Sequence, residues 1–248
     1  MHAFKKTPTG ILGLDEFLGG GLPSGRIILV IGGPGTGKTI MSAQFLFNGI
    51  TKYGENCIFV SLEEAKHHFY REMTHFGFDF QQLEKQKKFI FLDASPIRHM
   101  PEEVKIGKMR VGRSDFSIDS LIERIKTSAD MINAKRIAID PLTSLTLQYP
   151  DTFKRRTAIL DLIEALMMTD ATILVTTELQ RLGIERNVEL EEYITHGVIT
   201  LQTLSIERSS VRVIQVGKMR EVAIDLQPKP YRITEKGIEV FPKESIFR

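Results

Sequence analysis

The 248-residue sequence contains no tryptophan and only one cysteine, Cys57. One cysteine cannot form a disulfide within the chain, and it cannot supply a cysteine-rich zinc site. The longest unbroken apolar run, Ile27–Ile31, is far too short to span a bilayer. The first residues also lack the apolar stretch of a signal peptide. These absences predict a cytoplasmic protein that does not act within a membrane.

An excess of charge of one sign is also missing. The 33 Lys and Arg residues nearly balance the 31 Asp and Glu residues, so the net charge is +2. This balance does not by itself favour nucleic acid or an acidic membrane as a partner. Hydrophobic residues make up 42% and charged residues 26%, as in ordinary globular proteins. We therefore expect one folded domain over residues 1–248, with residues 197–248 as a β-hairpin extension of it.

Short apolar runs alternate with longer helix-like segments, which is typical of an α/β fold with a mostly parallel sheet and helices on both faces. The expected strands are Arg26–Ile31, Cys57–Ser61, Phe89–Asp93, Arg136–Asp140 and Thr172–Thr177. The expected helices are Lys38–Lys52, Ala65–Phe76, Ser117–Asn133 and Phe153–Thr169. In the third helix, apolar residues recur every three or four positions and mark one face. Farther on, Gly197–Leu204 and Ser210–Met219 predict an antiparallel hairpin, and Tyr231–Phe241 predicts a second, smaller one.

The strongest motif is a phosphate-binding loop. The pattern G-x-x-x-x-G-K-[ST] is matched by Gly32, Gly33, Pro34, Gly35, Thr36, Gly37, Lys38 and Thr39. Glycines let successive backbone N–H groups turn toward a phosphate, and the helix that follows directs its positive end at the same anion. Lys38 can reach the β- and γ-phosphates, and the hydroxyl of Thr39 can ligate Mg²⁺. Because the motif follows an expected strand and precedes an expected helix, a glycine-rich turn without a ligand is the weaker interpretation.

Such a loop needs a second carboxylate for the metal ion. Asp140 ends a short apolar strand, as this carboxylate usually does, but Asp93 ends another strand in the same way. Glu63 and Glu64 follow a strand and could orient a water molecule for attack on the γ-phosphate. Ser61 and Glu64 also form an S-x-x-E capping box, and the pattern alone favours this structural interpretation.

Three further side chains are candidates near phosphates. Gln180 follows the strand Thr172–Thr177 and could sense the γ-phosphate through its amide, although a surface role is the simpler interpretation. Lys218 and Arg220 lie two positions apart, so they share one face of a strand. Two neighbouring cations suit a γ-phosphate in the manner of an arginine finger, but they also suit a solvated edge that discourages strand pairing.

Taken together, these features show that the chain resembles the KaiC-like branch of the RecA superfamily of ATPases. The resemblance covers nearly the whole chain. The matching stretches are Thr9–Asp15, Gly20–Arg26, the phosphate loop, Gln44–Gly49, Phe76–Asp79, Leu92–Pro96, Leu121–Ile125 and Thr176–Glu178. The resemblance implies a RecA-like core, and a ring, usually a hexamer, with ATP between subunits. It also implies that Asp140 is the metal carboxylate and that Glu63 and Glu64 are the catalytic pair. Lys218 and Arg220 would then reach the γ-phosphate of the neighbouring subunit.

The sequence departs from the family after Arg220. Clock proteins of this type continue with glycine, where this chain has Glu221 followed by Val222-Ala223-Ile224. The adjacent Ser-Thr pair that a clock protein phosphorylates is replaced near Glu192-Tyr193, which disfavours an autokinase of that kind.

The resemblance and the residues together leave three functions open. The favoured one is a slow Mg²⁺-dependent ATPase that forms a homo-oligomeric ring with a regulatory or signalling role, with a protein partner that the sequence does not name. The second is a DNA-stimulated, recombinase-like ATPase, which the basic segment Arg98–Arg113 favours, with five Lys or Arg against two Glu. The segment Arg181–Glu192 counts against nucleic acid, because four Glu outnumber two Arg there. The third is a nucleotide switch that binds ATP without turnover.

Overall fold

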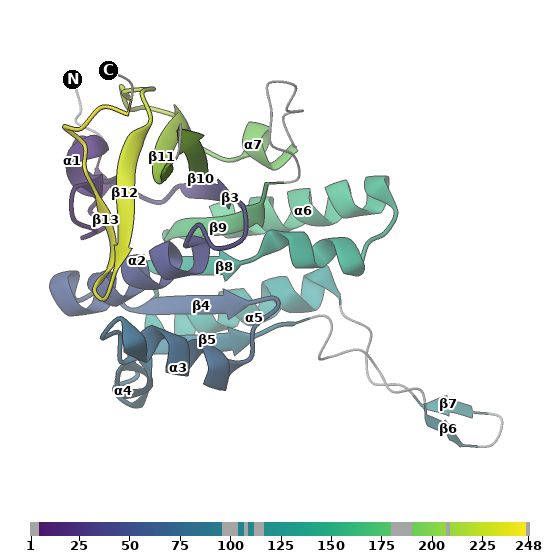
Figure 1. The fold of residues 1–248 in the computed structure, drawn as a ribbon. Helices are drawn as coiled ribbons and strands as arrows, with labels where there is room; N and C mark the ends of the chain where they lie inside the picture. Colours follow the sequence, from purple (N-terminus) through teal and green to yellow (C-terminus); the bar gives the residue numbers. More distant parts are fainter. Residues whose placement is uncertain are drawn as a thin grey trace.

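The computed structural model describes residues 5–95, 104–106, 109–111, 117–179, 190–206 and 209–246. Its main feature is a nine-stranded sheet with the order β13-β12-β11-β10-β3-β9-β8-β4-β5 (Figure 1). The strands from β10 to β5 in this order are parallel. Their bounds are β3 (Ile27–Gly32), β4 (Cys57–Ser61), β5 (Phe89–Asp93), β8 (Arg136–Asp140), β9 (Thr172–Glu178) and β10 (Gly197–Ile206).

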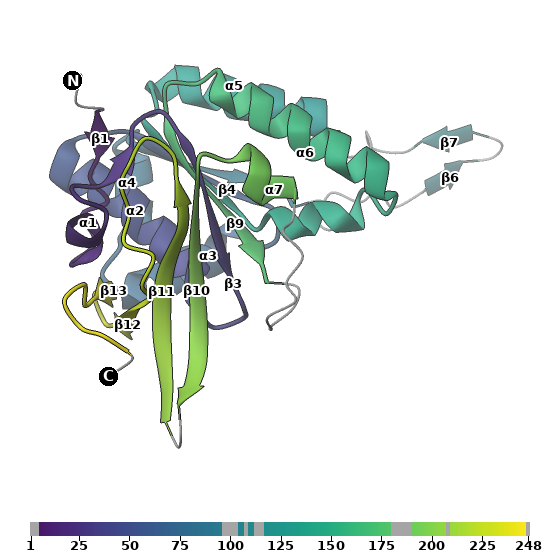
Figure 2. The same cartoon turned by 90° about the horizontal axis from the view of Figure 1, so that it is seen from above.

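The sheet continues into an antiparallel part formed by the C-terminal strands. These are β11 (Ser209–Met219), β12 (Lys229–Thr234) and β13 (Gly237–Val240). Figure 2 shows the long β10–β11 hairpin extending well beyond its neighbours in the sheet. The predicted fold class, a mostly parallel α/β sheet with a C-terminal antiparallel extension, is therefore confirmed.

Helices cover both faces of the sheet. α5 (Ile118–Ile132) and α6 (Thr152–Met167) lie along one face, and α2 (Lys38–Tyr53) and α3 (Lys66–His75) lie on the other (Figure 2). The remaining elements are β1 (Lys6–Thr7), α1 (Leu14–Phe17), β2 (Leu22–Pro23), α4 (Phe80–Lys85), β6 (Val104–Ile106), β7 (Met109–Val111), the 3₁₀ helix η1 (Leu142–Leu147) and α7 (Leu190–Ile194). Within the part of the chain that the structure describes, no helix has both the length and the apolar character needed to cross a membrane.

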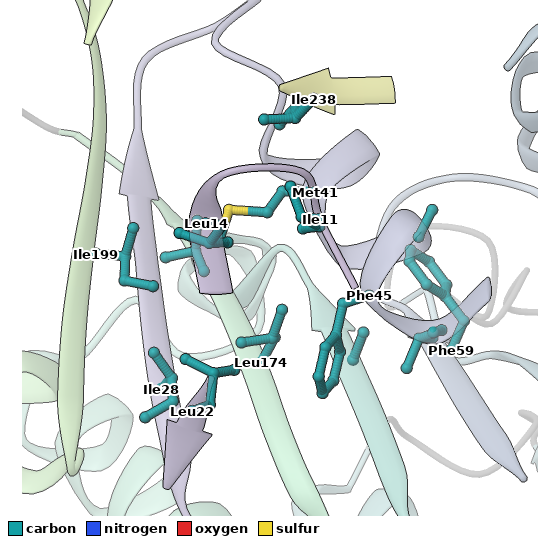
Figure 3. Close-up of a cluster of buried hydrophobic side chains, with 14 of the residues drawn as sticks. Ile11, Leu14, Leu22, Ile28, Met41, Phe45, Phe59, Leu174, Ile199 and Ile238 are labelled. Atoms are coloured by element: carbon teal, nitrogen blue, oxygen red, sulfur yellow. The ribbon is translucent and has the colours of Figure 1, made fainter. Parts of the chain in front are cut away.

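Two apolar clusters, one on each face of the sheet, form the core. Because side chains alternate along a strand, Ile28 of β3 belongs to the cluster under α2 and Leu29 to the cluster under α5 and α6. Figure 3 shows the first cluster, in which Phe45 of α2 lies near the sheet. In α5 the predicted apolar face is buried through Leu121 and Ile125. A sheet buried on both faces explains why its parallel strands are almost entirely apolar in sequence.

Candidate functional site

The glycine-rich loop joins the end of β3, at Gly32, to the start of α2, at Lys38. Gly35 and Gly37 have φ angles of 73° and 90°, a left-handed conformation that favours glycine. A Cβ atom added at Gly33 or Gly35 would meet no atom within 4 Å, so there is open space beside the turn. The sequence therefore folds here into a turn with room for an anion at the N-terminal end of a long helix.

Lys38 lies over this loop. Its Nζ atom donates hydrogen bonds to the carbonyl oxygens of Gly32 (2.9 Å) and Gly33 (3.1 Å). The hydroxyl of Thr36 also donates to Gly33 O, at 2.8 Å. These bonds stabilise the turn, and those of Lys38 hold its positive charge over the loop, where a phosphate would be bound.

Asp140, at the end of β8, is buried next to the start of α2. Thr39 Oγ1 donates to its Oδ2 atom at 2.8 Å, and the hydroxyl of Thr176 donates to its Oδ1 atom. Burial raises the pKa of Asp140, while these two hydrogen bonds and the charge of Lys38 act in the opposite direction. A carboxylate and a hydroxyl in contact are the oxygen ligands that Mg²⁺ takes, so the residues fit a divalent cation bound beside the loop.

The rival carboxylate, Asp93, occupies a different place. It ends β5, the edge strand of the sheet, and β4 separates β5 from β8. Asp140 rather than Asp93 is bonded to Thr39 of the phosphate loop. The geometry therefore favours Asp140 as the metal carboxylate.

A cleft of about 400 Å³ opens at this edge of the sheet. It is lined by Lys38, Thr39, Glu63, Glu64, Glu72, Asp140, Pro141 and Glu178. Both predicted glutamates are present, and Ser144 Oγ donates to Glu63 Oε2 at 3.4 Å. The cleft forms here because the carboxyl ends of β3, β4, β8 and β9 meet at one edge, where ligands bind in open α/β sheets.

Glu72 and Glu178 also line the cleft, although neither was among the predicted site residues. Glu178 is the last residue of β9, and its place at the carboxyl end of a parallel strand could have indicated it. Glu72 comes from the middle of α3, and its sequence neighbours carry no comparable signal.

The capping-box interpretation of Ser61 and Glu64 is wrong. α3 begins at Lys66, and its N-cap is Ala65, which has an extended conformation and offers no side-chain oxygen for capping. Ser61 Oγ instead donates to the main-chain oxygen of Glu64 at 2.6 Å. The serine therefore fixes the loop between β4 and α3, and Glu64 is left on the wall of the cleft.

Lys218 and Arg220 lie near the amino ends of the parallel strands, whereas the phosphate loop lies at their carboxyl ends. Lys218 pairs with Val198, which is level with Leu29 near the start of β3, whereas the phosphate loop begins where β3 ends. Lys218 Nζ donates to the carbonyl oxygens at the end of α7, those of Glu192, Tyr193 and Thr195, at 2.6–3.0 Å. Burial and the charge of Arg220 lower the pKa of Lys218. The pair does not line the cleft formed by its own chain.

Comparison with known proteins decides the family. A sequence profile described as "ATPase: KaiC" matches residues 7–245. The chain belongs to the KaiC ATPase family. It is 35% identical over 239 residues to the circadian clock oscillator protein KaiC of Prochlorococcus marinus (strain MIT 9313), covering 96% of this chain and 46% of that protein. For the KaiC of Synechococcus elongatus the identity is 35% over 242 residues, covering 97% of this chain and 45% of that protein.

The chain thus spans about half the length of these KaiC relatives, as their 46% and 45% coverage shows. A solved structure of a KaiC-like protein from the hyperthermophilic archaeon Pyrococcus horikoshii is similar over its whole length. That protein is 33% identical, its fold matches with a TM-score of 0.82, and the match covers 97% of this chain and 100% of the archaeal one.

The departure from KaiC clock proteins after Arg220 has a structural counterpart. Glu221 adopts a φ angle of 68°, a left-handed conformation in which glycine would be under less strain. Its carboxylate forms an ion pair with Arg26 at 2.8 Å. The backbone therefore turns as a glycine would allow, and the ion pair joins this turn to the segment that leads into β3.

Several residues predicted from their position after a strand or from the charge pattern lie outside the described residues. Gln180 is one of them, and so is most of the segment Arg181–Glu192. In the basic segment Arg98–Arg113, the structure describes the backbone of β6 and β7, which pair as a separate two-stranded sheet. Their proposed roles remain predictions.

Proposed function

We propose that this chain binds ATP together with Mg²⁺ and hydrolyses it slowly, within a ring in which each nucleotide lies between two copies of the chain. The observation that carries the proposal is the hydrogen bond between Thr39 and Asp140 at the head of the glycine-rich loop. It joins the phosphate-binding element and the metal carboxylate in the same cleft as Glu63 and Glu64. Membership of the KaiC ATPase family supports ATP as the nucleotide.

The residues of the cleft divide the chemistry between them. The loop N–H groups and Lys38 would bind the β- and γ-phosphates, and Thr39 and Asp140 would hold the metal ion. Bound Mg²⁺ would neutralise charge on the transferred phosphate. Glu63 and Glu64 would orient the attacking water and accept its proton, and the bond from Ser144 restrains Glu63 for this task.

The positions of Lys218 and Arg220 support an assembly. They lie at the edge of the sheet opposite the phosphate loop, so they can stabilise a γ-phosphate only if a second copy presents its cleft to them. Repeating this head-to-tail contact generates a ring when the rotation closes, and we expect six subunits from the resemblance. We further propose that residues 1–248 act as one domain, in the cytoplasm.

Phosphate release at high protein concentration tests the catalytic part of the proposal. Lys38→Ala should abolish both ATP binding and turnover, whereas Glu63→Gln or Glu64→Gln should retain binding and lower turnover by at least about 100-fold, as expected for loss of a general base. Lys88→Ala removes an exposed lysine outside the cleft and serves as the control. Normal turnover in Lys38→Ala would refute the proposed site.

Sedimentation velocity with and without Mg·ATP tests the assembly. A particle of about six subunits is what the ring proposal requires, and it would allow Arg220 to reach a neighbouring nucleotide. A monomer under both conditions would remove the role across subunits and leave an isolated nucleotide-binding domain. Tight ATP binding without phosphate release would favour the non-hydrolysing switch. A salt-sensitive gel shift with single-stranded DNA would favour the recombinase-like alternative.

A further inference from the structure

The C-terminal strands β12 and β13 lie beside α2, the helix that follows the phosphate loop, although they are far from it in sequence (Figure 1). Tyr231 of β12 is 2% exposed, and its hydroxyl donates a 2.6 Å hydrogen bond to the main-chain oxygen of Thr36. Thr36 belongs to the glycine-rich loop. A buried side chain near the end of the chain therefore contacts the backbone that would bind phosphate.

Gln44 of α2 fastens the same pair of strands. Its Oε1 atom accepts a hydrogen bond from Ile238 N at 2.7 Å, and its Nε2 atom donates to Ile238 O at 3.2 Å. The amide thus pairs with the β13 backbone as a neighbouring strand would. Figure 3 shows Ile238 of β13 close to Met41, one turn before Gln44 in α2. Together these contacts fix β13 on the first turns of α2, and β12 is paired with β13.

Because the peptide group is planar, the hydrogen bond from Tyr231 also sets the direction of the next N–H group in the loop. The Thr36–Gly37 bond is trans, so the carbonyl of Thr36 and the N–H of Gly37 point in opposite directions from one rigid plane. A donor bonded to the Thr36 oxygen therefore directs the Gly37 N–H away from Tyr231. Gly37 has a φ angle of 90° and lacks a side chain, so its backbone can rotate easily when nothing restrains that plane.

We propose that Tyr231 is a positioning residue for phosphate binding, which orients the Thr36–Gly37 peptide so that its N–H group faces the nucleotide. The inference rests on the proposed function, because it assigns Tyr231 to the same site. Burial raises the pKa of Tyr231 to about 12, so the hydroxyl keeps its proton and remains a donor at neutral pH. The side chain of Tyr231 does not line the cleft, and it acts through the loop rather than on the reacting atoms.

Isothermal titration of the full chain with Mg·ATP tests this role. Tyr231→Phe keeps the buried ring and removes the hydroxyl, and it should raise the Kd by about three- to tenfold, the range given by the loss of one hydrogen bond. The turnover number at saturating ATP should change less than twofold, because Tyr231 does not contact the reacting phosphate. Tyr149→Phe is the matched control, since the Tyr149 hydroxyl accepts a hydrogen bond from Ile118 N on the other face of the sheet from Tyr231.

Gln44→Met provides a second variant, because it releases β13 without altering Tyr231. This variant should also raise the Kd for Mg·ATP. Unchanged Kd values in both variants would overturn the inference, as would an equal loss of affinity in Tyr149→Phe, which would indicate a general loosening. Failure of the unmodified chain to bind Mg·ATP would instead refute the proposed function itself.

Discussion

At the scale of single residues, the buried charge of Arg136 determines which residue types can lie next to it. The side chain, at the start of β8, is 0% exposed. Its Nε atom forms an ion pair with Glu55 at 2.6 Å, and Nη1 donates to the main-chain oxygen of Phe45 at 2.9 Å. The guanidinium also packs on the Phe45 ring, 4.6 Å from its centroid. The space that the arginine needs comes from Gly49 of α2, where an added Cβ would lie 2.5 Å from Arg136 Cδ.

We therefore expect Gly49→Ala to lower the free energy of unfolding by about 1 to 3 kcal/mol, the usual cost of overpacking. Alanine is the better helix former by about 1 kcal/mol, so destabilisation would show that the steric conflict outweighs helix propensity. Urea denaturation would measure it. Gly217→Ala is the control, because a Cβ there meets no atom within 4 Å. A stabilised Gly49→Ala variant would show that Arg136 moves aside without cost.

Residues of the site differ in how far the sequence could reveal them. The phosphate loop could be predicted because its chemistry fixes both residue types and spacing within eight positions. Glu72 could not, because a glutamate in mid-helix looks the same whether it faces solvent or a cleft. Tyr231 could not either, since its hydroxyl meets Thr36 only through the tertiary fold.

At the scale of elements, α7 is held by a side chain from another element. This five-residue helix is too short to be stable alone, and Lys218 of β11 bonds to three carbonyl oxygens at its end. A cation at this end also interacts favourably with the helix dipole. Arg220 contributes one longer bond, 3.3 Å, to Tyr193 O. Lys218 is therefore tied more firmly to its own chain than Arg220 is.

Lys218→Met should consequently accelerate amide hydrogen exchange across α7, by about fivefold or more, corresponding to a loss of at least about 1 kcal/mol of local stability. Exchange measured by mass spectrometry on peptides that cover residues 190–196 would report it. Lys229→Met, which breaks an ion pair with Asp225 elsewhere in the C-terminal segment, should leave α7 unchanged. Equal exchange in Lys218→Met and the unmodified chain would mean that other contacts hold α7.

The elements show which sequence patterns are reliable. β4, β5 and β8 begin and end where predicted, because each is a short apolar run that the buried parallel sheet requires. α4 was not predicted, since its six residues offer too few turns for a periodic pattern. The capping box at Ser61 was a wrong prediction although the local pattern is present, because Ser61 bonds to the main-chain oxygen of Glu64 and the helix begins only after Ala65. Tertiary context decided that boundary.

At the scale of the whole molecule, the predicted phosphate-binding groups lie at opposite ends of the parallel strands of one sheet. The phosphate loop lies at the carboxyl edge of the parallel strands, and Arg220 lies beyond the amino edge. In a ring, a complete site would therefore combine the loop of one subunit with Arg220 of the next.

Mixing two inactive variants tests this division. Lys38→Ala subunits retain Arg220, and Arg220→Ala subunits retain the loop, so a mixed ring contains some complete sites. Random assembly of equal amounts should restore about a quarter of the unmodified phosphate release. Adding the double variant Lys38→Ala/Arg220→Ala to Arg220→Ala subunits should restore none, because neither supplies Arg220. Co-assembly without recovery would show that Arg220 does not act across subunits.

The order of the strands also determines when the site can form during synthesis at the ribosome. β3 carries the phosphate loop, yet its partners in the sheet are β9 and β10, which begin at Thr172 and Gly197. Tyr231 is translated later still. At about 5 to 20 residues per second, roughly 10 to 40 s separate Thr39 from Tyr231 during synthesis. A nascent chain therefore carries the phosphate-binding sequence long before the site exists, and only a chain that has been translated past Tyr231 can be stabilised by the nucleotide through the complete site.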